Sequence, residues 1–512
     1  MKRNKIIILL LCLLVGFALR FYRFDTKSLW MDEVHTYNDS RDDFQGQLKF
    51  FKENPTFLHP PLFFILTHQF YPFTKPERDL RIIPLIFGSL SIIMIYFLSK
   101  AFSPYIALPC TLSLTFMAYH ISLSQDGRSY SFLMFFGMTG LYFFMKHLKT
   151  LKGIYLLLVA FCFAILFHAS YSSIPFIALS QILWFYRARE DDKKPTLSSF
   201  LILNGIILIL CLPWIIFTVV NYKGQTLMDP SHTENPGSFW YIMYGILHDW
   251  VPHVPLMVAS VILLILSPFF SKIRKNAIVL MAVFILPVLG LYLYCRLLNV
   301  THFITSRYFI NFLPLFFISI YLSIDAIEIK FERLKKFVRL KFLFLILFIA
   351  SNLVILPLYY RHEKQDFRGM VNYLKGQLRE RDKIFVETGG HIPAILHYLG
   401  IYPERRHHIV TYLMNSEKIV GVEKSFIYQN KIFTIYYSKT CCTQYVADGG
   451  RVWIIVSKWR AKKLKSDSPS VLKGYFDGSF LNFSRFPDDA SMYLFLWDPK
   501  SPDEKGIDMP IE

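Results

Sequence analysis

Residues 82–99 read IIPLIFGSLSIIMIYFLS and contain no charged side chain. An α-helix rises about 1.5 Å per residue, so an apolar helix of this kind is close to the length that crosses the ~30 Å hydrocarbon core of a bilayer. Similar apolar segments recur along the chain. Ten more lie near 6–21, 104–121, 129–145, 153–168, 172–186, 198–220, 254–271, 276–295, 308–326 and 341–359. The sequence therefore predicts a polytopic α-helical membrane protein with about eleven spans.

The composition agrees with a membrane protein and argues against other classes. Of the 512 residues, 54% are apolar, 17% are aromatic and only 18% are charged, whereas soluble domains are roughly 45–50% apolar even when glycine is counted. A soluble enzyme, a disordered protein and a small disulfide scaffold are therefore not expected. Five of the seven cysteines lie in apolar segments. Cys441 and Cys442 do not, and whether they pair is left open.

The formal charge of +19 reflects the orientation of the protein in the membrane. Residues 59–71 are apolar but too short to cross a bilayer, so we expect them to lie along the membrane surface. Beyond the first three basic residues, the inner loops then hold 17 basic residues, and the short outer loops after residue 100 hold 4. Because basic loops stay in the cytoplasm, the first span starts inside and the tail lies outside. Nucleic acid is not needed as a partner.

The last 150 or so residues have the pattern of a soluble α/β domain. Apolar residues between Phe367 and Leu378 form one helical stripe. Short β-rich runs follow at Lys383–Thr388, Lys431–Tyr437, Val452–Ser457 and Met492–Trp497. We predict a transmembrane catalytic domain over 1–360, with an outer loop over 22–80, and an extracytoplasmic α/β domain over 361–512. No glycine-rich phosphate loop precedes a helix here, so no nucleotide site is assigned.

The outer loop contains a run, Ser28–Tyr37 (SLWMDEVHTY), that predicts a helix with Ser28 as its N-cap. Helical spacing places three apolar residues on one face and three polar residues on another: Trp30, Val34 and Tyr37, and Asp32, His35 and Asp39. A carboxylate shielded from water at a membrane boundary is a candidate general base, which points to Asp32. The alternative is an ordinary solvated helix face.

Three further groups of polar residues fall at span ends on the same outer side. His59-Pro60-Pro61-Leu62 marks a turn or a helix start. Ser124–Tyr130 (SQDGRSY) offers Asp126 and Arg128, which form either an ion pair or part of a site. Arg81 and Arg307 flank spans; each either extends its charge to the interface or presents a guanidinium fork to a lipid phosphate.

Together these features resemble the bacterial relatives of protein O-mannosyltransferases (glycosyltransferase family 39), in the GT-C superfamily that also includes the lipid A aminoarabinose transferases. The matching pattern is an N-terminal span, LWxDE, HPPL, an Arg opening the next span, Q[DE]xRxY and a later RY before a Pro-containing span. The resemblance is best through about residue 130 and looser beyond. Asp366-Phe-Arg before an amphipathic helix also resembles bacterial tails.

The resemblance implies roles for particular residues. It makes Asp32 the base that activates the acceptor, with Glu33 beside it and Asp126 as a further candidate. The residues that it implies for donor and acceptor binding are His59, Arg81, Arg128, Tyr130, Arg307 and Tyr308. The chain departs from the aminoarabinose transferases, which have a Lys-Pro pair in place of His59-Pro60. It also departs from the protein mannosyltransferases, which have Gly-Lys where this chain has Phe63-Phe64.

We therefore expect a cell-envelope enzyme in the cytoplasmic membrane that moves a sugar from a polyprenyl phosphate to an acceptor hydroxyl on its outer face. The acceptor is a glycolipid, a glycan or a protein, and its identity and the sugar are left open. No cofactor and no metal are expected, although Asp32 and His35, at i and i+3, could ligate one. The alternative is a transporter or flippase of lipid-linked sugars, which would place ionisable groups and interrupted helices within the spans.

Overall fold

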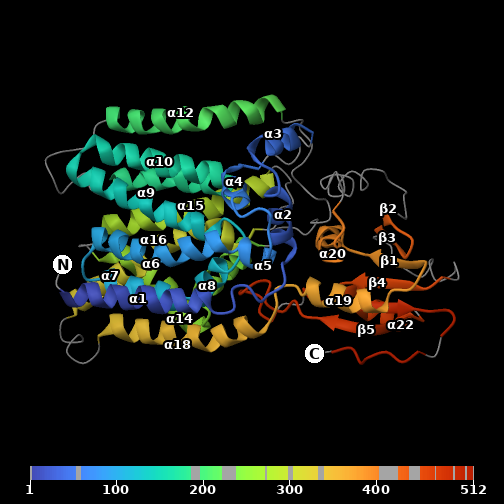
Figure 1. Ribbon diagram of the computed structural model, residues 1–512. Coiled ribbons are helices and arrows are strands. Elements are labelled where there is room, and N and C mark those ends of the chain that lie inside the picture. The colour runs from blue at the N-terminus through green and yellow to red at the C-terminus, as the bar shows by residue number, and fades with distance from the viewer. Residues whose placement is uncertain are drawn as a thin grey trace. The chain divides into compact units, whose positions relative to one another are not determined.

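The computed structural model describes residues 3–53, 59–185, 197–221, 238–270, 274–297, 304–331, 339–402, 425–437, 450–467, 469–487, 490–501 and 504–510. It separates into two compact units (Figure 1). We call them the helical unit (Met1–Asp25, Asp42–Thr74 and Arg78–Leu358) and the sheet unit (Thr26–Arg41, Lys75–Glu77 and Tyr359–Glu512). The sequence placed the whole outer loop with the spans, whereas Thr26–Arg41 and Lys75–Glu77 pack within the sheet unit. Cys441, Cys442 and the basic loops around 187–194 and 332–338 lie outside the described residues.

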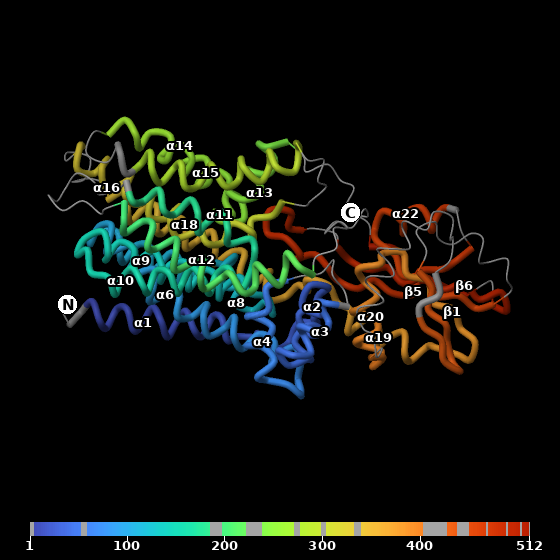
Figure 2. Tube along the Cα trace, turned by 90° about the horizontal axis from the view of Figure 1, so that it is seen from above, coloured from blue at the N-terminus to red at the C-terminus, as the bar shows by residue number. Residues whose placement is uncertain are grey.

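A helix or pair of helices occupies every segment predicted to span the membrane. The long ones are α1 (Arg3–Phe21), α6 (Ile82–Phe102), α9 (Tyr130–Thr150), α10 (Gly153–Ala169), α12 (Leu197–Asn221), α14 (Val254–Leu266), α15 (Arg274–Leu297), α16 (Leu313–Lys330) and α18 (Leu340–Arg361). Several of them lie side by side in the helical unit, with α6 against α1 and α9, and α10 against α9 and α12 (Figure 2). The predicted helical membrane architecture is confirmed.

Among the described residues, fewer helices have the length and hydropathy of a membrane span than the eleven segments predicted. Five described helices are long and apolar enough to cross a membrane, and a bent pair, Phe239–Trp250 with Val254–Phe269, would make a sixth. The chain is an integral membrane protein, and the count of eleven stays a prediction. The surface segment at 59–71 contains only a seven-residue helix, α4 (Leu62–His68), directly after Pro61.

Shorter helices complete the helical unit. They are α3 (Phe44–Glu53), α5 (Pro76–Asp79), α7 (Ala107–Phe116), α8 (Ala118–Ser124), α11 (Ile174–Ser180) and α13 (Phe239–Trp250), with 3-10 turns η1 (Tyr171–Ser173), η2 (Gln181–Phe185), η4 (Ser267–Phe269) and η5 (Ser306–Phe312). The α5 helix begins in the residues assigned to the sheet unit and ends in the helical unit. Tyr119, Asp249, Ser306 and Arg307, which are discussed below, lie on these short elements.

The predicted span at 104–121 is broken into α7 and α8 at Met117, whose ψ is 108°. A break leaves carbonyls and N–H groups without their helical partners, and buried side chains replace them here. Arg20 donates to the carbonyls of Leu114 at 2.9 Å and Thr115 at 3.3 Å. The Oδ1 of Asn352 accepts the N–H of Ala118 at 2.8 Å. The prediction of one continuous span here missed the break, because the residues that satisfy it are distant in the sequence.

The sheet unit is built on a six-stranded mixed sheet of order β2-β3-β1-β4-β6-β5. The strands are β1 (Asp382–Val386), β2 (Ser425–Gln429), β3 (Phe433–Tyr437), β4 (Val452–Val456), β5 (Val471–Phe476) and β6 (Met492–Trp497). Strands β3, β1 and β4 run parallel, and the outer pairings are antiparallel. The four predicted strands are present, while β2 and β5 were not predicted. Every residue of β4 is buried.

Helices cover the sheet and supply its core. They are α19 (Phe367–Gln377), α20 (Ile392–Leu399) and α22 (Lys458–Asp467), with a 3-10 turn η6 (Gly389–His391) before α20. The stripe predicted for α19 is buried at Phe367, Met370, Val371 and Leu374. Helix α22 packs Ala461 and Leu464 into the same core as the strands. A further helix, α2 (Met31–Asp39), lies against α20 and carries Asp32.

Candidate functional site

The helix that carries Asp32 begins at Met31, with Trp30 as its N-cap. The prediction of Ser28 as the N-cap was wrong, because the N–H of the N-cap Trp30 donates to Glu33 Oε2 at 3.3 Å. A carboxylate at the third helical position is a common acceptor for this N–H. Ser28 lies outside the helix, where its Oγ accepts the N–H of Arg368 at 3.1 Å.

The apolar face of α2 is buried, as its spacing predicted. Trp30 and Val34 are 2% and 0% exposed, and Tyr37 is buried as well. The ring of Tyr37 lies 4.4 Å from that of His397 in α20, nearly edge to face. This packing fixes which side of α2 faces α20 within the sheet unit.

The two neighbouring carboxylates of α2 have different surroundings. Asp32 is half-buried, and Glu33 is fully buried. The Glu33 carboxylate binds the N–H at the start of its own helix. Asp32 is therefore partly accessible to solvent, whereas the observed contact of Glu33 stabilises the start of the helix that carries both residues.

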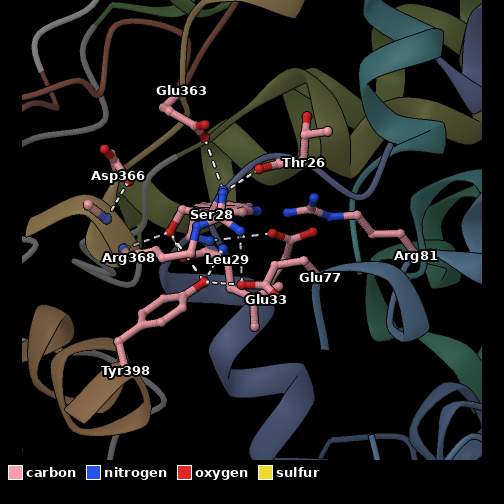
Figure 3. A network of polar contacts seen from close by, with 12 residues as sticks. Thr26, Ser28, Leu29, Glu33, Glu77, Arg81, Glu363, Asp366, Arg368 and Tyr398 are labelled. Carbon is pink, nitrogen blue, oxygen red and sulfur yellow. Dashed lines mark hydrogen bonds and ion pairs between the residues drawn. The ribbon is translucent and has the colours of Figure 1, made fainter. Parts of the chain in front are cut away.

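A polar network surrounds the residues that lead into α2 (Figure 3). The hydroxyl of Tyr398, at the end of α20, accepts the N–H of Leu29 at 2.7 Å and donates to Glu77 Oε1 at 3.1 Å. The guanidinium of Arg368, in α19, lies 3.4 Å from the same Glu77 oxygen. Its Nη2 also donates to the carbonyl of Thr26.

Lys27 is the second anchor of this segment. Its side chain is buried, and Nζ donates to the carbonyls of Tyr359, at 2.6 Å, and His362. The ammonium also lies 4.7 Å from the centre of the Tyr359 ring, within the range of a cation–π contact. These contacts join residues 26–31 to the first residues of the C-terminal part of the chain.

Two histidines of the sheet unit are held uncharged by their surroundings. Burial lowers the pKa of His391 and that of His397 to about 4. His391 packs its ring against Phe367, at 5.3 Å, and His397 packs against Tyr37. Both imidazoles are therefore neutral at pH 7, and their low pKa values make them weak proton acceptors.

In the helical unit, three polar side chains from three separate elements form a chain. The hydroxyl of Tyr119, in α8, lies 2.7 Å from that of Ser306, the first residue of η5. Ser306 Oγ in turn donates to Asp249 Oδ2, at the end of α13. All three residues are buried. Asp249 was not singled out from the sequence, and the only indication was an acidic residue beside an apolar segment.

Arg307 and Tyr130, both predicted site residues, meet in the helical unit. The Arg307 guanidinium lies 6.0 Å from the centre of the Tyr130 ring, and its Nε donates to Thr305 Oγ1 at 3.2 Å. Tyr130 is the first residue of α9, and Arg307 directly follows Ser306 in η5. Arg307 is half-buried. The chain Tyr119–Ser306–Asp249 therefore positions the backbone that carries this cation.

Asp126 and Arg128 form a tight turn between α8 and α9. The N–H of Arg128 donates to the carbonyl of Asp126 at 2.6 Å. Asp126 is 1% exposed, whereas Arg128 is half-buried. The neighbouring Gln125 donates through Nε2 to the carbonyls of Arg20, at 2.7 Å, and Tyr22, at 2.8 Å. The turn is thus fixed to the end of α1.

The remaining predicted residues of the helical unit differ in exposure. Arg81, directly before α6, is 2% exposed and donates through Nη1 to the carbonyl of Phe24 at 3.0 Å. His59 is exposed, and Tyr308 is half-buried. The buried Arg81 therefore makes a structural hydrogen bond, in addition to any role toward a ligand.

The predicted site residues thus fall into both units. Asp32 and Glu33 belong to the sheet unit, and His59, Arg81, Asp126, Arg128, Tyr130, Arg307 and Tyr308 belong to the helical unit. Arg307 and Tyr130 are in contact, and Asp126 and Arg128 share one turn. Among the residues that the structure describes, no group of three or more His, Cys, Asp or Glu side chains is arranged to hold a metal ion.

Comparison of the fold with solved structures gives two matches along almost the entire chain. The structure of ArnT from Cupriavidus metallidurans bound to undecaprenyl phosphate aligns with a TM-score of 0.52 and 12% identity, over 97% of this chain and 98% of that one. The apo state of the same protein gives 0.55 and 10%, over 96% and 97%. The chain has the GT-C fold.

The GT-C fold predicted from the sequence motifs is therefore confirmed. The oligosaccharyltransferase of Archaeoglobus fulgidus also aligns, with a TM-score of 0.44 and 11% identity over 77% of this chain and 61% of that one, and we infer nothing from so weak a likeness. No protein-family model matches the sequence. No curated protein sequence matches it significantly either.

Proposed function

We propose that this protein is a membrane glycosyltransferase that moves a sugar from a polyprenyl-phosphate donor to an acceptor hydroxyl on the outer face of the cytoplasmic membrane. The observation that carries the proposal is the GT-C fold, shared over 97% of the chain with an ArnT structure bound to undecaprenyl phosphate. The LWxDE and HPPL motifs support the same activity.

In the proposed reaction, Asp32 removes the proton of the acceptor hydroxyl. The oxygen forms a bond to the anomeric carbon while the bond from that carbon to the lipid phosphate breaks, so the phosphate leaves with the electron pair. A single displacement inverts the configuration at this carbon. The half-buried carboxylate of Asp32 supports this role because it can meet a substrate, unlike the buried Glu33.

We assign to the cations of the helical unit the role of stabilising the negative charge that grows on the leaving phosphate. Arg307 is the first choice, because it is half-buried and its guanidinium is held over Tyr130. Arg128 is the second. Arg81 remains in the proposal, but its contact with the Phe24 carbonyl also makes it a structural residue. A guanidinium suits this task because it offers paired donors to phosphate oxygens.

The transporter alternative has one observation in its favour. Arg20 is fully buried beside a broken helix, a combination that transporters use at their binding sites. The geometry favours a structural role instead, since Arg20 donates to three main-chain carbonyls, those of Gly16, Leu114 and Thr115. Its charge therefore offsets the carbonyls that the break exposes.

The test uses the full-length protein in lipid nanodiscs with radiolabelled polyprenyl-phosphate sugars and a panel of glycolipid, glycan and peptide acceptors. We expect label on an acceptor, with inverted anomeric configuration. In sealed vesicles, movement of the lipid-linked sugar across the bilayer without any transfer would contradict the proposal and support the transporter.

A further inference from the structure

We propose that the C-terminal part of the sheet unit is a positioning platform for the Asp32 helix, with Tyr398 as its main positioning residue. This inference rests on the proposed function, in which Asp32 is the base. It assigns a role to residues 359–512, which neither the motifs nor the fold comparison explains.

The backbone N–H groups that lead into α2 are all hydrogen-bonded. They belong to four successive residues, Ser28 to Met31. Trp30 donates within its own helix to Glu33. The other three donate to side chains of the C-terminal part: Ser28 to Glu363 at 3.1 Å, Leu29 to Tyr398 at 2.7 Å and Met31 to Gln365 at 3.2 Å.

These three bonds fix the backbone at the start of the helix. The groups concerned surround the N-cap, where a helix otherwise leaves its N–H groups to water. Because the acceptors come from Glu363, Gln365 and Tyr398 rather than from water, both the axis and the rotation of α2 are defined by the C-terminal part. We call these three hydrogen bonds the clamp. Asp32 follows Met31 directly, so the clamp determines the direction in which the Asp32 carboxylate points.

The place where α2 docks on the sheet supports the same conclusion. Strands β1 and β4 are parallel neighbours, yet the chain leaving β1 returns to β2 and β3, and the chain leaving β4 returns to β5 and β6. The carboxyl ends of two such strands form the crevice where open α/β sheets usually bind ligands. The turn after β1 contains Gly389 and Gly390.

In this protein the side chain of Met31, from the same chain, lies against that turn. A Cβ placed on Gly390 would lie 2.6 Å from Met31 Sδ. The glycine thus lets the Met31 side chain lie against this turn, and a larger residue at position 390 would require that side chain to move. The sheet presents an edge typical of ligand binding, and the first residue of the Asp32 helix packs against it.

Tyr398 is the residue best suited to a test, because its hydroxyl makes three hydrogen bonds. Phenylalanine keeps the ring and removes the bonds to the Ser28 hydroxyl, the Leu29 N–H and Glu77. Tyr475→Phe is the matched control, since the Tyr475 hydroxyl lies 3.0 Å from that of Ser491, elsewhere in the sheet unit. Both variants lose one phenolic hydroxyl from a part-buried position.

We expect Tyr398→Phe to transfer sugar about 10–100-fold more slowly, because a base displaced by about 1 Å can cost 10²-fold, with the KM for the donor unchanged. Amide exchange over residues 29–34 should rise in Tyr398→Phe only. Equal rates in the two variants, or unchanged exchange in Tyr398→Phe, would overturn the platform. The exchange measurement does not depend on Asp32 being the base, so failure of the proposed function can be distinguished.

A second pair of variants tests the docking edge. Gly390→Val should displace Met31 and slow transfer in the same way. Gly376→Val, at a position in α19 where an added Cβ meets nothing within 4 Å, is its control for the loss of a glycine. Equal transfer rates in these two variants would overturn the docking of α2 at this edge.

Discussion

The guanidinium of Arg20 lies 2.8 Å from Nδ1 of His120, and both side chains are fully buried in the helical unit. The two residues meet beside the break between α7 and α8, where Arg20 also binds the carbonyls of Leu114 and Thr115. Tyr119 and His120 lie in the first turn of α8, two and three residues after Met117. Arg20 therefore supports the segment from which Tyr119 reaches Ser306.

We predict that Arg20→Gln destabilises the protein by several kcal/mol, because buried carbonyls lose charged hydrogen-bond donors. The melting temperature in detergent should fall clearly. Arg23→Gln is the control, since Arg23 is exposed and three residues away. If the two variants melt at the same temperature, Arg20 does not hold the break.

The apolar segments and four of the six described strands could be predicted from the sequence because their residues follow a simple pattern. The break at Met117 could not, since the residues that satisfy it, Arg20 and Asn352, are distant in the chain. The same holds for the N-cap of α2. Ser28 is a good capping residue, but the N–H of Arg368 binds its hydroxyl.

The sequence motifs predicted a set of candidate site residues but not how those residues are arranged in space. Asp249 was missed because a lone acid beside an apolar segment resembles an interface residue until its contact with Ser306 is seen. Tyr398 and Lys27 were missed because nothing in the sequence shows which groups they contact. The burial of Arg81 likewise depends on a carbonyl from a segment distant in the sequence.

We predict that Arg307→Ala weakens binding of the lipid-linked donor by about 10-fold or more, and that Arg307→Lys restores only part of it, because the paired donors of the guanidinium are lost. Arg296→Ala is a suitable control, since Arg296 also lies over a ring, that of Tyr292 at 5.4 Å, but is exposed. Donor affinity should be measured with a fluorescent polyprenyl-phosphate analogue. Equal affinity in Arg307→Ala and Arg296→Ala would move the phosphate site elsewhere.

The predicted orientation can be tested by cysteine labelling in a variant without native cysteines. Trp459 and Tyr105 are 70% and 74% exposed, and the charge asymmetry places the first outside and the second inside. We expect an impermeant maleimide added to intact cells to label Trp459→Cys but not Tyr105→Cys. The reverse pattern would contradict the orientation on which the outer site depends.

We predict that the sheet unit loses stability as the pH falls below about 6.5. The pKa values of His391 and His397 are about 4 in the folded protein but about 6.5 when unfolded. The unfolded chain thus binds more protons, and each histidine costs about 2 kcal/mol between pH 7.5 and pH 5. Amide exchange of sheet-unit peptides measures this loss. His397→Gln should flatten the dependence, and an equal slope in both proteins would contradict the assignment.

The central claim is that Asp32 is the general base, and Asp32→Asn tests it most directly because asparagine keeps the shape and removes the basicity. The measurement is the rate of sugar transfer by the full-length protein in nanodiscs, with donor binding measured in parallel. Loss of a general base commonly costs ~10²–10⁴ in rate. We predict normal donor binding with transfer reduced by at least ~10²-fold, whereas near-normal transfer would contradict the account and make Asp126 the next candidate.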